Sequence, residues 1–144
     1  MENSIIKDFK KKEPGVRLYS HYVPLLEKHL LASEFKFILS LLSYITAGDC
    51  IIRKTYHHNS KPLTEKEISE ICGMTYDYTK KLMSQLIKKG IAAKIDMKII
   101  YPEYSGKYKK VYTVNPFIFS RGGNQLSTIL SYYNEIDWEK RLIS

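Results

Sequence analysis

The clearest alternation of apolar and polar positions lies between residues 63 and 90, and it predicts two helices joined by a tight turn. Thr64 and Glu67 are spaced as a capping box that begins the first helix, directly after Pro62. Gly73 is expected to end that helix in the left-handed conformation, which glycine adopts at little cost. Small and apolar residues at helical spacing form the predicted buried stripe: Ile68, Ser69, Ile71, Met74, Thr79, Leu82 and Leu86. This pattern is typical of a helix-turn-helix.

The second of these helices has a polar face opposite its predicted stripe. The helix ends at Lys88-Lys89-Gly90, where the two lysines favour the negative end of the helix dipole. Its outward positions are Thr75, Tyr76, Asp77, Lys80, Lys81 and Ser84. In helix-turn-helix proteins, the N-terminal and outer positions of the recognition helix reach the DNA. We therefore predict that these six residues bind DNA; an ordinary helical hairpin inside a core is the alternative.

Helical periodicity also precedes this unit. Residues 22–31 predict a short helix with Pro24 in its first turn. Residues 33–47 predict a longer helix that Ser33 caps and that is largely buried. Its apolar stripe consists of Phe35, Ile38, Leu39, Leu42 and Ile45, widened by Phe37, Leu41 and Tyr44. Residues 50–56 then predict a short strand.

Period-two alternation follows the second helix of the pair and predicts a β-hairpin. Residues 91–101 and 109–114 are the expected strands, and residues 102–108 form a turn-rich tip. The strand near Ile51 would complete a three-stranded sheet. A helix-turn-helix followed by a hairpin is a winged helix, so the predicted fold class is mainly α (α+β) with helical N- and C-terminal extensions.

The tip of this hairpin is the predicted wing. Its candidate DNA-binding residues are Tyr104, Lys107, Tyr108, Lys109 and Lys110. Contacts from these residues to the sugar-phosphate backbone would position the protein without reading sequence. A solvated, charged hairpin tip is the alternative.

Three parts are predicted along the chain. Residues 1–20 form a flexible arm that Lys7, Lys10, Lys11 and Lys12 make basic. This arm either touches DNA phosphate or is only solvated. Residues 21–123 form the winged-helix domain, and residues 124–144 form a C-terminal helical element. The apolar stripe of that element consists of Leu126, Ile129, Leu130 and Tyr133, extended by Ile136 and Trp138. This stripe either closes the monomer core or pairs with a second copy, since two-fold DNA sites favour dimers.

Charge narrows the class of partner. The chain has 144 residues and carries 23 Lys and Arg against 15 Asp and Glu, which gives a formal net charge of +8. Its isoelectric point is near 9.3. Such an excess of positive charge suits a polyanionic partner, double-stranded DNA in the first place.

No motif for catalysis, a cofactor or a metal is found in the sequence. Cys50 and Cys72 do not make a disulfide framework, and together with His57 and His58 they show no metal-ligand spacing. The first residues lack an apolar signal core, and no segment approaches the length of a membrane span. We therefore expect a non-enzymatic protein of the reducing cytoplasm, without cofactor, metal or membrane partner.

The hairpin and the segment after it carry a family resemblance. Residues 109–122 read KKVYTVNPFIFSRG, a strand that runs into Asn-Pro and then Arg-Gly, and residues 134–139 read NEIDWE. With a helical N-terminal region and a helix-turn-helix in front of them, these segments resemble the RepL-type replication proteins of Firmicute plasmids. The resemblance covers about residues 30–140, and it implies DNA binding in the control or initiation of plasmid replication.

The expected function is therefore sequence-specific binding of double-stranded DNA by a homodimer from a mobile element, in plasmid or phage replication. A transcriptional repressor with the same fold is one alternative, and only the position of the DNA site separates the two. The second alternative is a winged helix that docks another protein through its tyrosines and its C-terminal stripe. Binding would then depend only weakly on salt.

Overall fold

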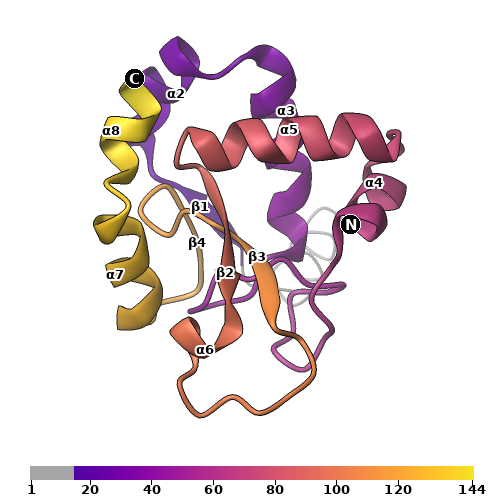
Figure 1. The fold of residues 1–144 in the computed structure, drawn as a ribbon. Coiled ribbons are helices and arrows are strands. Elements are labelled where there is room, and N and C mark those ends of the chain that lie inside the picture. Colours follow the sequence, from indigo (N-terminus) through magenta and orange to yellow (C-terminus); the bar gives the residue numbers. More distant parts are fainter. Residues whose placement is uncertain (1–14) are drawn as a thin grey trace, which may run out of the picture.

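Helices flank two small antiparallel sheets in the computed structural model, which describes residues 15–144 (Figure 1). Of the described residues, 48% are helical and 16% are in strands, which is compatible with the predicted α+β class. The elements in chain order are β1 (Val16–Leu18), η1 (Ser20–Tyr22), α2 (Val23–His29), α3 (Ala32–Leu41), η2 (Leu42–Tyr44), α4 (Glu65–Cys72), α5 (Tyr76–Lys88), β2 (Ala92–Asp96), α6 (Met97–Ile100), β3 (Lys110–Val114), β4 (Phe119–Arg121), α7 (Ser127–Glu135) and α8 (Trp138–Ile143).

The two predicted helices of the 63–90 segment are present as α4 and α5, with the expected local signals. The Thr64 side chain accepts a hydrogen bond from the Glu67 backbone N–H at 3.2 Å, and the Glu67 carboxylate accepts one from the Thr64 N–H at 3.1 Å. Gly73 ends α4 with φ +64°, in the left-handed region. The residues of this pair buried against the core are Ile68, Ser69, Thr79, Leu82, Met83 and Leu86.

The prediction that Ile71 belongs to the buried stripe is wrong, because Ile71 is 39% exposed. It lies in the last turn of α4, and there the next residue, Cys72, turns toward α3 instead. The Sγ atom of Cys72 lies 3.7 Å from the Oγ atom of Ser40. Met74, just after the turn, is only half-buried.

Gly90, which follows α5, lies against the C-terminal helix. It has φ +76°, and an added Cβ atom would lie 2.8 Å from the backbone oxygen of Trp138. An added Cβ at Gly73 would have no atom within 4 Å, although its φ is also positive. Both glycines therefore avoid backbone strain, but only Gly90 also permits a close approach of two backbone segments.

This difference gives a matched pair of substitutions. Gly73→Ala should lower the free energy of unfolding by about 1–2 kcal/mol, which is the cost of the left-handed conformation alone. Gly90→Ala should lose about 1–3 kcal/mol more than Gly73→Ala, because the new methyl group overpacks the contact with Trp138. Urea unfolding followed by circular dichroism measures both. Equal losses would contradict a tight contact between this turn and α8.

The long helix predicted over residues 33–47 is wrong at both ends. It begins after Leu31, whose N–H donates to the Glu34 carboxylate at 2.7 Å, so Ser33 is not the cap. At the other end, Arg121 donates from Nη2 to the Leu42 carbonyl at 3.0 Å and from Nε to the Ile45 carbonyl at 2.8 Å. These bonds satisfy carbonyls that a continuing helix would use, and Ile45 instead pairs with residue 52 in extended conformation.

The buried face of α3 is also narrower than predicted. It consists of Glu34, Phe37, Ile38 and Leu41. Leu39 is 42% exposed, and Phe35 and Leu42 are only half-buried. One cause is Glu34, whose buried carboxylate pairs with the Lys89 ammonium at 2.6 Å and takes a place on the inner face.

The hairpin differs from the prediction at its first strand, which ends at Asp96. The Asp96 carboxylate accepts a hydrogen bond from the Lys98 N–H at 2.9 Å and caps the short helix α6, which replaces the predicted strand over residues 97–100. β2 pairs antiparallel with β3 from Ala92↔Val114 to Asp96↔Lys110. The predicted strand near Ile51 lies beside β3, but only through the bridge Ile51↔Thr113 and two flanking hydrogen bonds.

The segment after the hairpin forms β4, which the sequence did not predict. It pairs antiparallel with β1, in the register Val16↔Arg121 to Leu18↔Phe119. β1 lies inside the range predicted as a flexible arm, so that arm does not include residues 16–18. Its predicted basic positions, Lys7, Lys10, Lys11 and Lys12, lie outside the described residues.

The C-terminal helices pack within the monomer, which is one of the two expected outcomes. Tyr133 is fully buried, and its hydroxyl lies 2.9 Å from the Thr113 Oγ1 atom of β3. The Trp138 ring packs edge-on against Tyr22, with 5.2 Å between ring centroids, and stacks on Phe117 at 5.9 Å. Much of the C-terminal stripe is therefore used inside the chain, where it packs on β3, on η1 and on the turn before β4, while α8 lies against α2.

None of the helices within residues 15–144 is both long and apolar enough to cross a membrane.

Candidate nucleic-acid interface

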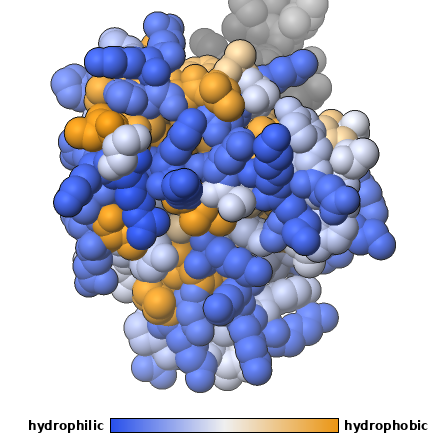
Figure 2. Space-filling view, turned by 45° about the horizontal axis from the view of Figure 1, so that its top comes forward, coloured by the Kyte–Doolittle hydropathy of each residue, from blue (hydrophilic) through white to orange (hydrophobic). Residues whose placement is uncertain are grey.

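One side of α5 is held in the core and the other faces solvent. Thr79, Leu82, Met83 and Leu86 are buried, so the helix cannot rotate without exposing its apolar stripe. The six predicted recognition residues are all exposed, and together we call them the α5 face: Thr75, Tyr76, Asp77, Lys80, Lys81 and Ser84. Hydrophilic residues predominate on the face of the molecule shown in Figure 2, with smaller apolar patches between them.

Thr75 caps the N-terminal end of α5, where the α5 face begins. The Thr75 side chain accepts a hydrogen bond from the Tyr78 N–H at 3.2 Å, and Asp77 lies in the first turn, where the helix dipole favours a negative charge. Tyr76 is 47% exposed, and the Lys80 ammonium lies 5.1 Å from the centre of its ring. This cation–π contact holds the Lys80 ammonium beside the exposed ring of Tyr76, which lies one helical turn before Lys80 in α5.

A second lysine–tyrosine contact continues this surface onto the hairpin. The Lys94 ammonium of β2 lies 5.3 Å from the ring centre of Tyr112 on β3, and the Tyr112 hydroxyl donates to the Glu65 carboxylate of α4. Burial, the hydrogen bond to Glu65 and the nearby phenol of Tyr76 all raise the pKa of Tyr112. The buried ring of Tyr112 thus lies close to Lys94 of the hairpin, to Glu65 of α4 and to Tyr76 at the start of α5.

Sequence reasoning did not include Tyr78 and Lys94 among the candidate residues. Tyr78 is 41% exposed beside the α5 face, and Lys94 is exposed between two inward-facing residues of β2. Both signals were present in the sequence. Tyr78 directly precedes Thr79, the first buried position of α5, and Lys94 is one of the two polar positions in the β2 alternation, with Asp96.

The predicted wing residues do not all stand free at the hairpin tip. Tyr104 and Tyr108 are half-buried, and the Tyr104 hydroxyl accepts a hydrogen bond from the Tyr108 N–H at 3.1 Å. The Lys107 ammonium lies 5.2 Å from the ring centre of Tyr108, while Lys109 and Lys110 are exposed. The lysines thus remain available for phosphate, but the two tyrosine rings fold back toward the body of the protein.

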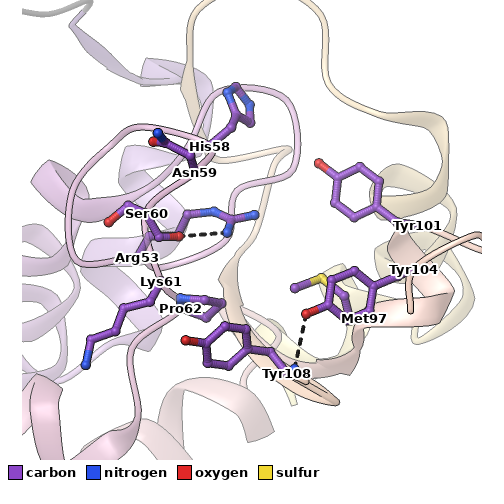
Figure 3. Close-up of a pocket in the computed structure, with 10 residues that line it drawn as sticks. All are labelled: Arg53, His58, Asn59, Ser60, Lys61, Pro62, Met97, Tyr101, Tyr104 and Tyr108. Atoms are coloured by element: carbon purple, nitrogen blue, oxygen red, sulfur yellow. Dashed lines mark hydrogen bonds between the residues drawn. The ribbon is translucent and has the colours of Figure 1, made fainter. Parts of the chain in front are cut away.

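These rings form one wall of a cleft of about 450 Å³ (Figure 3). The opposite wall is the loop that follows Arg53. The residues around the cleft are Arg53, His58, Asn59, Ser60, Lys61, Pro62, Met97, Tyr101, Tyr104 and Tyr108. The cleft therefore lies between the predicted wing and the segment that leads into α4.

A buried polar network fixes the position of that loop. The carboxylate of Asp49, which is fully buried, accepts hydrogen bonds from Arg53 Nη2 at 3.2 Å and from the Tyr101 hydroxyl at 2.6 Å. Arg53 also donates from Nε to Thr46 Oγ1 at 3.1 Å and from Nη1 to the Ser60 carbonyl at 3.0 Å. Burial and then the hydrogen bond to Asp49 raise the pKa of Tyr101, so its hydroxyl stays a donor.

No group of three or more His, Cys, Asp or Glu that could hold a metal is found within residues 15–144. Cys50 and Cys72 are both free thiols. Cys50 is buried and donates to the Gln125 side-chain oxygen at 3.1 Å. Burial and the neighbouring Asp49 raise the pKa of the Cys50 thiol, which is the opposite of what a nucleophilic cysteine requires.

Comparison of the chain with protein families, with curated proteins and with solved structures finds no match.

Proposed function

We propose that this protein is a winged-helix protein that binds double-stranded DNA and inserts α5 into the major groove. The observation that carries the proposal is the α5 face, a capped helix with a buried inner side and an exposed side that bears Tyr76, Asp77, Lys80 and Lys81. The turn at Gly73 and the hairpin β2–β3 are the neighbours that such a recognition helix has in this fold class.

The residues of the α5 face would have different roles. Lys80 and Lys81 suit guanine edges or flanking phosphates, and Tyr76 can donate its hydroxyl to a phosphate. Asp77 can accept from the amino group of cytosine, although its position in the first turn also suits the helix dipole. Outside this face, Lys107, Lys109 and Lys110 of the hairpin loop would add contacts that carry no sequence information.

For the biological role, we propose the control or initiation of replication of a plasmid or phage, in the cytoplasm and as a homodimer. The support is the resemblance to RepL-type proteins over residues 30–140 together with the net charge of +8. A transcriptional repressor would use the same surface. A role in docking another protein through the C-terminal stripe has less support, because Trp138 and Tyr133 are buried within the chain.

Selection of bound sequences from random duplex DNA, at a low and a higher salt concentration, tests this proposal. We expect an enriched motif with two-fold symmetry and an affinity that falls steeply with salt, by about 0.9 in log–log slope for each neutralised phosphate. The genomic position of the motif, at a replication origin or at a promoter, separates the two roles. Absence of enrichment together with absence of salt-dependent binding would overturn the DNA proposal.

A further inference from the structure

The cleft between the hairpin loop and the loop after Arg53 has the size and the two-sided lining of a small-ligand site. Its volume of about 450 Å³ lies within the usual range of ligand pockets, about 300–1,000 Å³. Figure 3 shows Arg53 and Tyr101 approaching each other from opposite walls on one side of the cleft, and Pro62, Met97 and Tyr108 on another. One part of the lining is therefore polar and the other apolar.

The apolar part offers a face for a flat ring. Pro62 and Met97 are buried, and the half-buried ring of Tyr108 lies beside them. The Lys107 ammonium lies 5.2 Å from the centre of the Tyr108 ring, but Lys107 does not line the cleft. Tyr108 itself lines the cleft, so its ring can contact a ligand bound there.

The charges around the cleft are already balanced. Arg53 pairs with Asp49 at 3.2 Å, and Lys61 pairs with Glu67. The remaining basic side chain of the lining, His58, has its Nε2 atom bonded to the Ala47 carbonyl at 2.6 Å. Because Arg53 and Lys61 each have a carboxylate partner, the cleft provides little net attraction for an anion, and a neutral ligand fits it better.

The polar part nevertheless retains hydrogen-bonding capacity. Arg53 uses three of the five N–H groups of a guanidinium on Thr46, Ser60 and Asp49, which leaves two without a bond to the described residues. The Tyr101 oxygen donates its hydrogen to Asp49 and keeps its lone pairs as acceptors. Fixed donors and an acceptor around a flat apolar slot match the edge of a heteroaromatic ring that carries both C=O and N–H groups.

We propose that this cleft binds a nucleobase, either of a free nucleoside or of a nucleotide in a single strand. The ring stacks on Tyr108 between Pro62 and Met97, and its polar edge meets Arg53 and Tyr101. This inference is independent of duplex binding by the α5 face, because none of the residues named here belongs to that face. The cleft and the α5 face would be two separate nucleic-acid-related sites on one chain.

Nuclear magnetic resonance titration of the full chain tests the proposal. Adenosine, cytidine, guanosine and thymidine are added separately, followed by single-stranded oligoadenylate and oligothymidylate. We expect saturable shifts of the backbone amides in residues 54–62 and 101–109 for at least one nucleoside or oligomer. Tyr108→Ala should weaken that binding about tenfold or more, because stacking of a base on an aromatic ring is lost.

A control variant distinguishes loss of the ring that lines the cleft from a general effect of removing a tyrosine. Tyr19→Ala removes an exposed ring outside the cleft and should leave binding unchanged. If Tyr108→Ala fails to fold, Tyr108→Leu keeps apolar bulk and removes the aromatic face together with the hydroxyl. Binding of nucleosides identifies a free ligand, and binding of oligomers alone identifies a base within a strand. Absence of saturable binding, shifts confined to the α5 face, or full affinity without the Tyr108 ring would each overturn the proposal, whatever the outcome with duplex DNA.

Discussion

Asp49→Ala should lower the free energy of unfolding by about 3–5 kcal/mol, the largest loss that we expect from a single substitution in this protein. The Asp49 carboxylate is fully buried and is the partner of Arg53, of the Tyr101 hydroxyl and of the Ile51 N–H. Its removal leaves the guanidinium of Arg53, whose side chain is only 9% exposed, without a counter-charge. Urea unfolding followed by circular dichroism gives the change directly.

The double-mutant cycle with Arg53→Met shows whether the pair itself causes this loss. Asp49→Ala with Arg53→Met removes both charges, so the double variant should be more stable than the sum of the two single losses predicts. Lys61→Ala is the matched control, because Lys61 forms an exposed pair with Glu67 and should cost at most about 1 kcal/mol. A loss for Asp49→Ala no larger than that for Lys61→Ala would mean that the Asp49 site is open to water.

The helix pair α4–α5 could be predicted from the sequence because its signals are local. The capping box at Thr64 and the left-handed Gly73 act within a few residues of the helix ends that they determine. The buried side of α5 follows from helical spacing alone, so the orientation of Lys80 and Lys81 toward solvent was also predictable. Contacts with distant parts of the chain confirm these features but are not needed to infer them.

Features that depend on distant residues could not be predicted in this way. α3 ends early because the Arg121 side chain binds the carbonyls of Leu42 and Ile45, nearly eighty positions earlier in the chain. β1 and β4 are each three residues long and exist only as a pair, so neither has a recognisable pattern of its own. In both cases the deciding partner is remote in sequence.

The cleft could not be predicted from the sequence for the same reason, because it also depends on contacts that the sequence pattern does not reveal. Tyr104 and Tyr108 are indistinguishable in sequence from exposed wing tyrosines, and only the bond between the Tyr104 hydroxyl and the Tyr108 N–H shows that the loop folds back. Arg53 appears in the sequence as one more cation, although the structure places it in a buried network with Asp49. The positive charge that is available to an anionic partner is therefore smaller than the total count of basic residues suggests.

Exchange of both Lys80 and Lys81 for alanine should weaken duplex binding by several kcal/mol in total. Each lysine accounts for about 1–3 kcal/mol if it contacts a base. Where the lysines neutralise phosphates instead, the log–log salt slope should fall by about 0.9 per residue. Fluorescence anisotropy with the selected duplex, measured over a series of salt concentrations, distinguishes these two kinds of contact. Stability should be nearly unchanged, because both side chains are exposed.

The matched control removes the same charge from another part of the surface. Lys98 on α6 and Lys140 on α8 are exposed and lie outside the α5 face, so the double exchange Lys98→Ala and Lys140→Ala lowers the net charge equally. If α5 is the recognition helix, the control should retain most of its affinity, since a site-specific contact depends on position and not only on charge. Equal weakening in both double variants would indicate nonspecific attraction by net charge, and unchanged binding without Lys80 and Lys81 would show that α5 does not contact DNA.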